Sequence, residues 1–147
     1  MSLFVGGTGS ANELDDYEEG EYTVTAACNS GSITLKTSYN TFGYTKIGRL
    51  VTINGRVDVD SVSSPSGELT LSLPFSVMNG TGLAGSGAAS LFIYNVSSGN
   101  TGDWIAWSDD TNSLLYLRLG NSNYGTGGAS YIQGNTEFRV TYTYMTS

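Results

Sequence analysis

The sequence of 147 residues predicts one all-β domain, an antiparallel β-sandwich of the jelly-roll type. Apolar residues recur at every second position, which is the period of a strand with one buried face, and the three-to-four-residue period of an amphipathic helix is missing. Only 13% of the residues are charged, and 20 glycines with many Ser, Thr and Asn residues supply turns. The readable segments add up to about eight or nine strands, which suits a two-sheet fold.

Residues 1–20 are predicted to form an extended lead-in that carries an acidic strip, and residues 21–147 to form the sandwich. The strip lies in ELDDYEEGEY, where residues 13–21 hold six of the 13 acidic residues. The other seven nearly cancel the six Lys and Arg residues, so the net charge of −7 has a local origin. Without a basic cluster, no binding to nucleic acid is expected. Without a run of about 18 apolar residues, no membrane insertion is expected.

Four segments show the clearest alternation: SITLKTSY (32–39), ELTLSLPF (68–75), SLLYLRL (113–119) and EFRVTYTY (137–144). EYTVTAA, LFIYNV and DWIAWS are predicted to be further strands. The side chains predicted to share a buried face within each of the four segments are Ile33, Leu35, Thr37 and Tyr39; Leu69, Leu71, Leu73 and Phe75; Leu115, Leu117 and Leu119; and Phe138, Val140, Tyr142 and Tyr144.

The segment RLVTINGRVDVD (49–60) allows two interpretations. Asn54-Gly55 is a strong hairpin signal, but a two-residue turn there would pair Ile53 with Arg56 and mix core and surface residues on one face. An unbroken strand instead aligns Val51, Ile53, Gly55, Val57 and Val59. The unbroken strand is therefore favoured, with Gly55 at a bulge or a close crossing.

Catalysis is not expected, because the chain has no histidine and its single cysteine has no partner for thiolate chemistry. Asp103 with Asp109 and Asp110, or Asp58 with Asp60, offer the residue types of a glycosidase pair. Adjacent Asp residues in SDDTNS are more simply explained as a turn, because Asp and Asn hydrogen-bond their own backbone there.

No cofactor or metal is expected. GTGLAG (80–85) matches the pattern G-x-G-x-x-G, but a dinucleotide site needs a helix after it, and the sequence SGAASLFIY indicates a loop that enters a strand. The regular Asp-x-Asp-x-Asx-Gly spacing of a calcium loop is absent. A single cysteine also excludes a Cys-based metal site within the chain.

The segment DWIAWSDD places two tryptophans beside acidic groups, as in sites where rings stack on sugars and carboxylates accept hydroxyls. Alternation puts Trp104 and Trp107 on opposite faces; burial of both rings between sheets or subunits is the alternative. If DWIAWS and SLLYLRL form a hairpin, WSDDTN (107–112) is its turn, and the loops SSGNTGDW (97–104) and GNSNYG (120–125) meet at the other end. The ligand-binding residues predicted there are Asp103, Trp104, Asn121, Asn123 and Tyr124, with Asp109 at the far end.

Three stretches in order, LDDYEEG (14–20), YTKIGRLVTINGRV (44–57) and LSLPF (71–75), resemble a module at the C-terminal ends of bacteriophage tail fibres and related virion proteins. Residues 76–147 resemble it only in their Gly, Ser and aromatic content. In the family the acidic run is commonly followed by Gly-Thr-Trp-Thr-Pro, whereas this chain has GEYTVTA. Tyr22 stands where that Trp is common, so no role of the Trp carries over.

The resemblance implies a homotrimeric virion protein, assembled in the host cytoplasm, with a fibre shaft upstream. It implies a non-enzymatic head module that binds a glycan or protein on the host cell surface; a purely structural trimerisation cap or decoration is the alternative. Face aromatics such as Tyr142 and Tyr144 exceed what one small core requires, which fits a trimer. The acidic strip would then dock against Lys46 and Arg49 of a neighbour, or remain a solvated linker.

Overall fold

The computed structural model of the chain describes residues 3–4, 13–14, 16–80, 87–97, 103–120 and 127–147. Within these residues there is no α-helix, and no helix is long and apolar enough to cross a membrane. The elements are β1 (Leu3–Phe4), β2 (Glu13–Leu14), β3 (Tyr17–Thr23), β4 (Ala26–Leu35), β5 (Thr41–Ile47), β6 (Leu50–Ser72), β7 (Ala88–Tyr94), β8 (Asp103–Ser108), β9 (Leu114–Gly120), the 3-10 turn η2 (Gly128–Tyr131) and β10 (Glu137–Met145).

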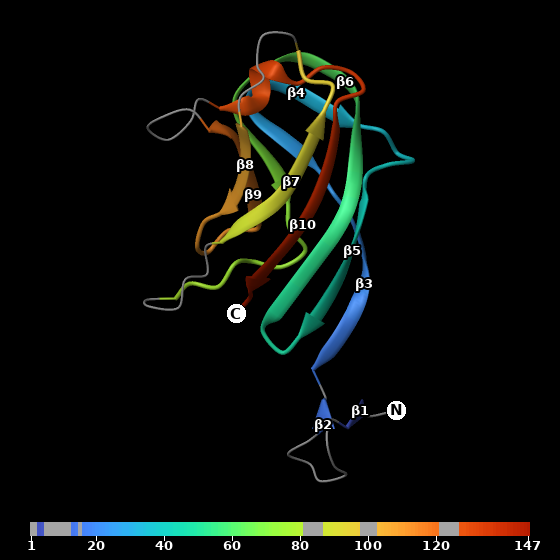
Figure 1. The fold of residues 1–147 in the computed structure, drawn as a ribbon, viewed down its shortest axis with the longest axis vertical. Helices are drawn as coiled ribbons and strands as arrows, with labels where there is room; N and C mark the ends of the chain where they lie inside the picture. Colours follow the sequence, from blue (N-terminus) through green and yellow to red (C-terminus); the bar gives the residue numbers. More distant parts are fainter. Residues whose placement is uncertain (1–2, 5–12, 15, 81–86, 98–102, 121–126) are drawn as a thin grey trace.

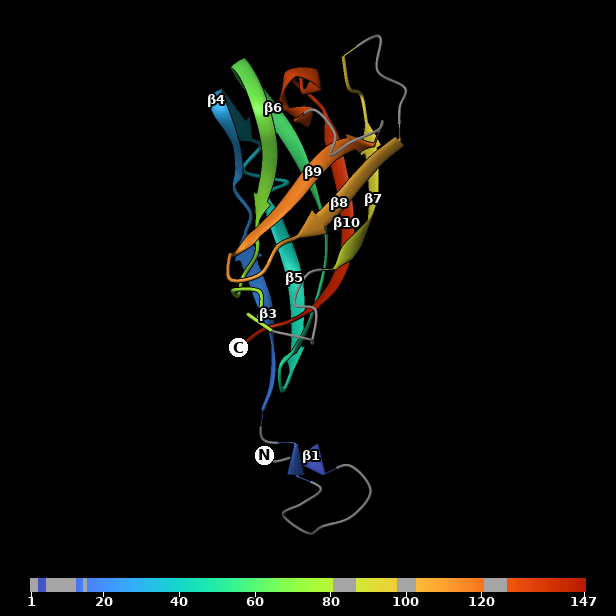
Figure 2. The ribbon, with the colours of Figure 1, turned by 90° about the vertical axis from the view of Figure 1, so that its left-hand side faces the viewer.

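Five antiparallel strands close into a barrel in the order β6, β10, β7, β8, β9 and back to β6 (Figure 1, Figure 2). Strand β6 is long enough to pair twice, through residues 50–58 with β10 and through residues 69–72 with β9. Strand β7 likewise pairs with β10 through residues 90–94 and with β8 through residues 88–89. The prediction of an all-β antiparallel fold is confirmed. The sandwich is not, because β6 and β7 join the edges that would separate two sheets.

Three further strands of the eight-stranded sheet lie outside the barrel. Strand β5 pairs with the first half of β6 on the edge opposite β10, and β3 pairs with β5. Strand β4 runs beside the second half of β6, with several register shifts. The unbroken strand through Asn54-Gly55 is confirmed, and so is the close crossing: a Cβ on Gly55 would lie 2.1 Å from Cδ1 of Phe42.

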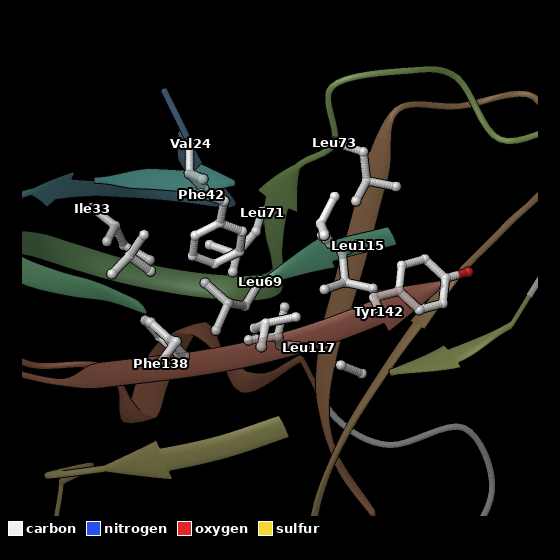
Figure 3. Close-up of a cluster of buried hydrophobic side chains, with 14 of the residues drawn as sticks. Val24, Ile33, Phe42, Leu69, Leu71, Leu73, Leu115, Leu117, Phe138 and Tyr142 are labelled. Atoms are coloured by element: carbon white, nitrogen blue, oxygen red, sulfur yellow. The ribbon is translucent and has the colours of Figure 1, made fainter. Parts of the chain in front are cut away.

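The core fills the barrel with the side chains that alternation predicted (Figure 3). Leu69, Leu71, Leu115, Leu117 and Phe138 are all fully buried. The prediction was wrong for Thr37 and Tyr39, because β4 ends at Leu35 and the chain turns there, with the amide of Tyr39 bonded to the carbonyl of Lys36 at 2.9 Å.

The N-terminal residues form a separate pair of short strands, β1 and β2, which lie beyond one end of the barrel (Figure 1). Strand β3 begins at Tyr17, within the residues assigned to the lead-in, and pairs with β5 along its full length. The acidic strip therefore enters the sheet as an edge strand.

Candidate functional site

The hairpin predicted from DWIAWS and SLLYLRL is present as β8 and β9. Asp103, which is exposed, lies opposite Gly120 at the end where the flanking loops were predicted to meet. The other predicted residues of those loops, Asn121, Asn123 and Tyr124, lie outside the described residues. The described part of the predicted site is therefore Asp103 and Trp104.

The two tryptophans lie on opposite faces of β8, as alternation predicted. Trp104 packs against the core and meets the ring of Tyr131 edge-on, with ring centroids 6.4 Å apart. Trp107 faces outward and stacks on Tyr116, with centroids 4.9 Å apart, while the Arg118 guanidinium lies 5.2 Å from the Trp107 ring centroid. The assignment of Trp104 to a ligand site stays a prediction, and in this structure its ring serves packing.

Exposed apolar side chains gather on another surface. The solvent side of β3, β5, the first half of β6, β10 and β7 is here called the outer face. At one end of it lie Tyr17, Ile47 and Leu50, which are 44%, 45% and 45% exposed. Toward the other end, on β7, lie Phe92 and Tyr94, which are 54% and 64% exposed. Exposed apolar groups that cluster in this way mark candidate interaction sites.

Beside Phe92 and Tyr94, four charged side chains form a continuous series of ion pairs. Arg56 donates from Nε and Nη2 to both carboxylate oxygens of Asp58 at 2.8 Å. Glu137 bridges the two arginines, since it accepts from Arg56 Nη2 at 2.9 Å and from Arg139 Nε at 2.5 Å. The hydrogen bond to Asp58, with the charges of Asp58 and Glu137, raises the pKa of Arg56. The network holds two positive and two negative charges in fixed positions.

Aromatic rings support this network. The Arg56 guanidinium lies 4.7 Å from the ring centroid of Tyr39, and that of Arg139 lies 5.7 Å from the ring centroid of Phe92. Both distances are in the range of cation–π contacts, which orient the planar groups. Tyr39, Arg56, Phe92, Tyr94 and Arg139 are here called the aromatic–arginine patch.

Two adjoining shallow hollows cross the outer face from this patch. The first, of about 570 Å³, lies between Phe92 and Arg139 on one side and Asn54 on the other. The second, of about 590 Å³, continues from Asn54 toward Glu19 and Glu21. Both hollows are open to solvent along the sheet. Their lining offers hydroxyls and one amide, since Thr45, Thr52, Asn54, Ser90 and Thr141 line one or both.

This combination of groups is suited to a carbohydrate. Aromatic faces can stack on the C–H faces of a sugar ring, while guanidinium, amide and hydroxyl groups hydrogen-bond its hydroxyls. The surface is open along the sheet, so a chain of several sugar units fits it better than a small enclosed ligand.

One signal for this patch is present in the sequence. In LFIYNV, Leu91 and Ile93 pair with inward residues of β10, whereas Phe92 and Tyr94 point outward. A strand that is apolar on both faces is typically buried on both faces. Here the core buries one face, and a binding partner would bury the other. Tyr39, Arg56 and Arg139 carry no comparable local signal.

The acidic strip is largely engaged within the chain. Lys46 forms an ion pair with Asp16 at 2.9 Å, and the hydroxyls of Tyr44 and Tyr17 donate to Glu18 and Glu19, each at 2.5 Å. Lys46 is therefore used inside the chain, whereas Arg49 is exposed at the turn between β5 and β6. Acidic residues on an edge strand also oppose pairing with the same edge of another copy.

Asp109 and Asp58, which were singled out from the sequence, have structural partners. The amide of Asp110 donates to Oδ1 of Asp109 at 3.0 Å, which is the turn interaction expected of SDDTNS. Asp58 is buried and held by Arg56. Within the described residues, no three His, Cys, Asp or Glu side chains come together to hold a metal ion.

The fold and its open face define a small β-barrel module with additional strands, and known structures contain such a module. The chain matches the crystal structure of the Dettilon tailspike protein (gp208) with a TM-score of 0.68 and 18% sequence identity. The match covers 88% of this chain and 24% of the tailspike chain, so the chain spans about a quarter of that protein. No protein-family model matches the chain, and no curated protein matches it. At 18% sequence identity, this structural similarity is evidence for the fold alone.

Proposed function

We propose that this chain is a non-enzymatic head module of a phage tail fibre or tailspike, a component of the virion that binds a glycan on the host cell surface. The observation that carries the proposal is the aromatic–arginine patch, on a module whose fold is that of part of a tailspike. The sequence resemblance of residues 14–75 to tail-fibre modules is an independent support.

The position of the patch agrees with this role. The chain enters the sheet through β3, at the end near β1 and β2 (Figure 1). Phe92, Tyr94 and Arg139 lie toward the opposite end, because Arg139 is six residues from Met145 along β10, or about 20 Å. If a fibre shaft precedes the chain, the patch is on its distal part, where a host surface is met first.

The proposal includes a homotrimer, in which three weak sites act together. Tyr142 and Tyr144 were predicted from the sequence to support a trimer. In the structure these side chains are 1% and 4% exposed and belong to the chain's own core. The homotrimer is supported instead by the exposed apolar side chains of the outer face. A purely structural cap is the second candidate, because a flat β-face can also serve contacts within the virion.

A glycan array tests the proposal. The purified protein is expected to bind at least one immobilised bacterial surface polysaccharide, and the double variant Phe92→Ala/Tyr94→Ala to bind it at least tenfold more weakly, about 1.4 kcal/mol per site. Ile105→Ala is the matched control, since Ile105 is 49% exposed on β8, away from the patch.

The array also separates the alternatives. Weakening by Asp103→Ala with no effect of the Phe92/Tyr94 variant would place the site at the end of the β8–β9 hairpin. A folded protein that binds none of the polysaccharides would favour the structural cap.

A further inference from the structure

A row of three apolar side chains crosses the outer face at the end near the N-terminal strands. Tyr17 on β3 lies opposite Ile47 on β5, and Ile47 lies opposite Leu50 on β6. Each is a little under half exposed. Neighbours across adjacent strands form one continuous strip, and Met145 extends it onto β10. Such a strip on a solvent face indicates an interface.

Opposite charges flank this row on its two sides. On the β3 side are Glu19 and Glu21, of which Glu21 has no ion pair within the described part of the chain. At the β5–β6 turn is Arg49, exposed and without a side-chain partner among the described residues. The other Lys and Arg residues all have one: Lys36, Lys46, Arg56, Arg118 and Arg139.

We propose that this row, with Arg49 and the acids of β3, is the contact between copies of the chain; this inference rests on the proposed homotrimer and names the surface that forms it. The β3 side of one copy packs against the β5–β6 turn of the next, so that Glu19 and Glu21 face the neighbour's Arg49 across the apolar row. A head-to-tail contact of two different surfaces forms a closed ring when the same rotation, applied from copy to copy, returns to the first copy after the third, as the cyclic symmetry of a trimer requires.

The residues present favour a second copy over other occupants. The chain itself carries both complementary charges beside the apolar row. Nucleic acid would be repelled by Glu19 and Glu21, and a sugar makes little use of Ile47 and Leu50, which offer no aromatic face. A standard interface buries about 800 Å² per partner. Tyr17 with Glu19 and Glu21 is the centre of one of the two contacting surfaces, and Leu50 with Arg49 is the centre of the other. The second hollow, which Glu19, Glu21, Thr45 and Thr52 line, is thereby part of this interface, and the first hollow remains for the glycan.

Equilibrium sedimentation of the full chain at micromolar concentration tests the proposal by charge exchange. Arg49→Glu alone and Glu19→Lys/Glu21→Lys are each expected to weaken association at least tenfold. Combined in one chain, the three substitutions are expected to restore it to near the original strength, because the charges face each other again with reversed sign. These side chains are exposed, so circular dichroism is expected to remain unchanged in every variant.

Leu50→Asp supplies an independent measurement, with Ile105→Asp as the control of similar exposure. Leu50→Asp is expected to give monomers, and Ile105→Asp to leave association unchanged. An oligomeric parent that is insensitive to Leu50→Asp and Arg49→Glu would overturn this interface and leave the trimer itself standing. Weakening without recovery in the combined variant would overturn the contact between copies, and a monomeric parent would overturn both interface and trimer. Glycan binding is measured separately on the array, so its failure is distinguishable from either.

Discussion

Gly55→Ala is expected to destabilise the fold by about 3 kcal/mol, at the upper end of overpacking effects. The added Cβ would lie 2.1 Å from Cδ1 and 2.7 Å from Cγ of Phe42. Phe42 is fully buried, and its ring meets the ring of Tyr22 edge-on, with the ring centroids 6.0 Å apart. The Phe42 ring therefore has no free space to move into. For a domain of this size, 3 kcal/mol corresponds to a fall in Tm of about 10 °C.

Gly43→Ala is the matched control. Gly43 is on the next strand, beside Phe42, and pairs with Asn54, but a Cβ there would have no atom closer than 3.9 Å. Thermal unfolding followed by circular dichroism is expected to show a Tm close to that of the parent. Equal Tm values for the two variants would contradict the view that Gly55 exists to let Phe42 fill the barrel.

The same glycine illustrates what local sequence can and cannot predict. Asn54-Gly55 is a turn signal. However, Val51, Ile53 and Val57 can all be buried on the same face only if the strand continues through it, and burial of that face favours the continuous strand. Alternation therefore predicted the strands and most of the core. Closure of the barrel depends on β6 pairing with β10 in its first part and with β9 in its last part. No local sequence pattern encodes that choice of partners.

The candidate site was harder to predict for the same reason. Ligand-binding residues were predicted where aromatic and amide groups are close in sequence, around Trp104 and residues 121–124. The aromatic–arginine patch instead joins Tyr39, Arg56, Phe92 and Arg139, which only the register of β6, β10 and β7 brings together. Glu137, which contacts both arginines, is two residues from Arg139 on β10 but lies on a different strand from Arg56.

Buried tyrosines give the fold a weakness at high pH. Burial raises the pKa of Tyr22, Tyr142 and Tyr144 above the ordinary value. The hydroxyl of Tyr144 donates to the carbonyl of Phe75 at 3.0 Å, and that of Tyr142 shares a 2.5 Å hydrogen bond with Ser108. Each ring is therefore held in its protonated form in the folded chain.

The sign of the pH effect follows from these raised values. Below pH 10 both folded and unfolded chains keep these protons, so the stabilising contribution is fully present. As the pH rises above about 10, the unfolded chain ionises first, and the free energy of unfolding falls by up to about 1.4 kcal/mol per pH unit for each such tyrosine. We expect cooperative unfolding above this pH, measured by urea titrations between about pH 8 and pH 11.5.

Tyr144→Phe separates this effect from general alkaline damage. The variant is expected to be less stable at pH 8, because the carbonyl of Phe75 loses its donor, but to lose stability less steeply above pH 10, because one raised pKa is removed. Tyr94→Phe is the control, since it removes the same hydroxyl from a ring that is 64% exposed. The explanation requires a change of slope, and parallel pH profiles for Tyr144→Phe and the parent would show that the buried tyrosine does not set the alkaline limit.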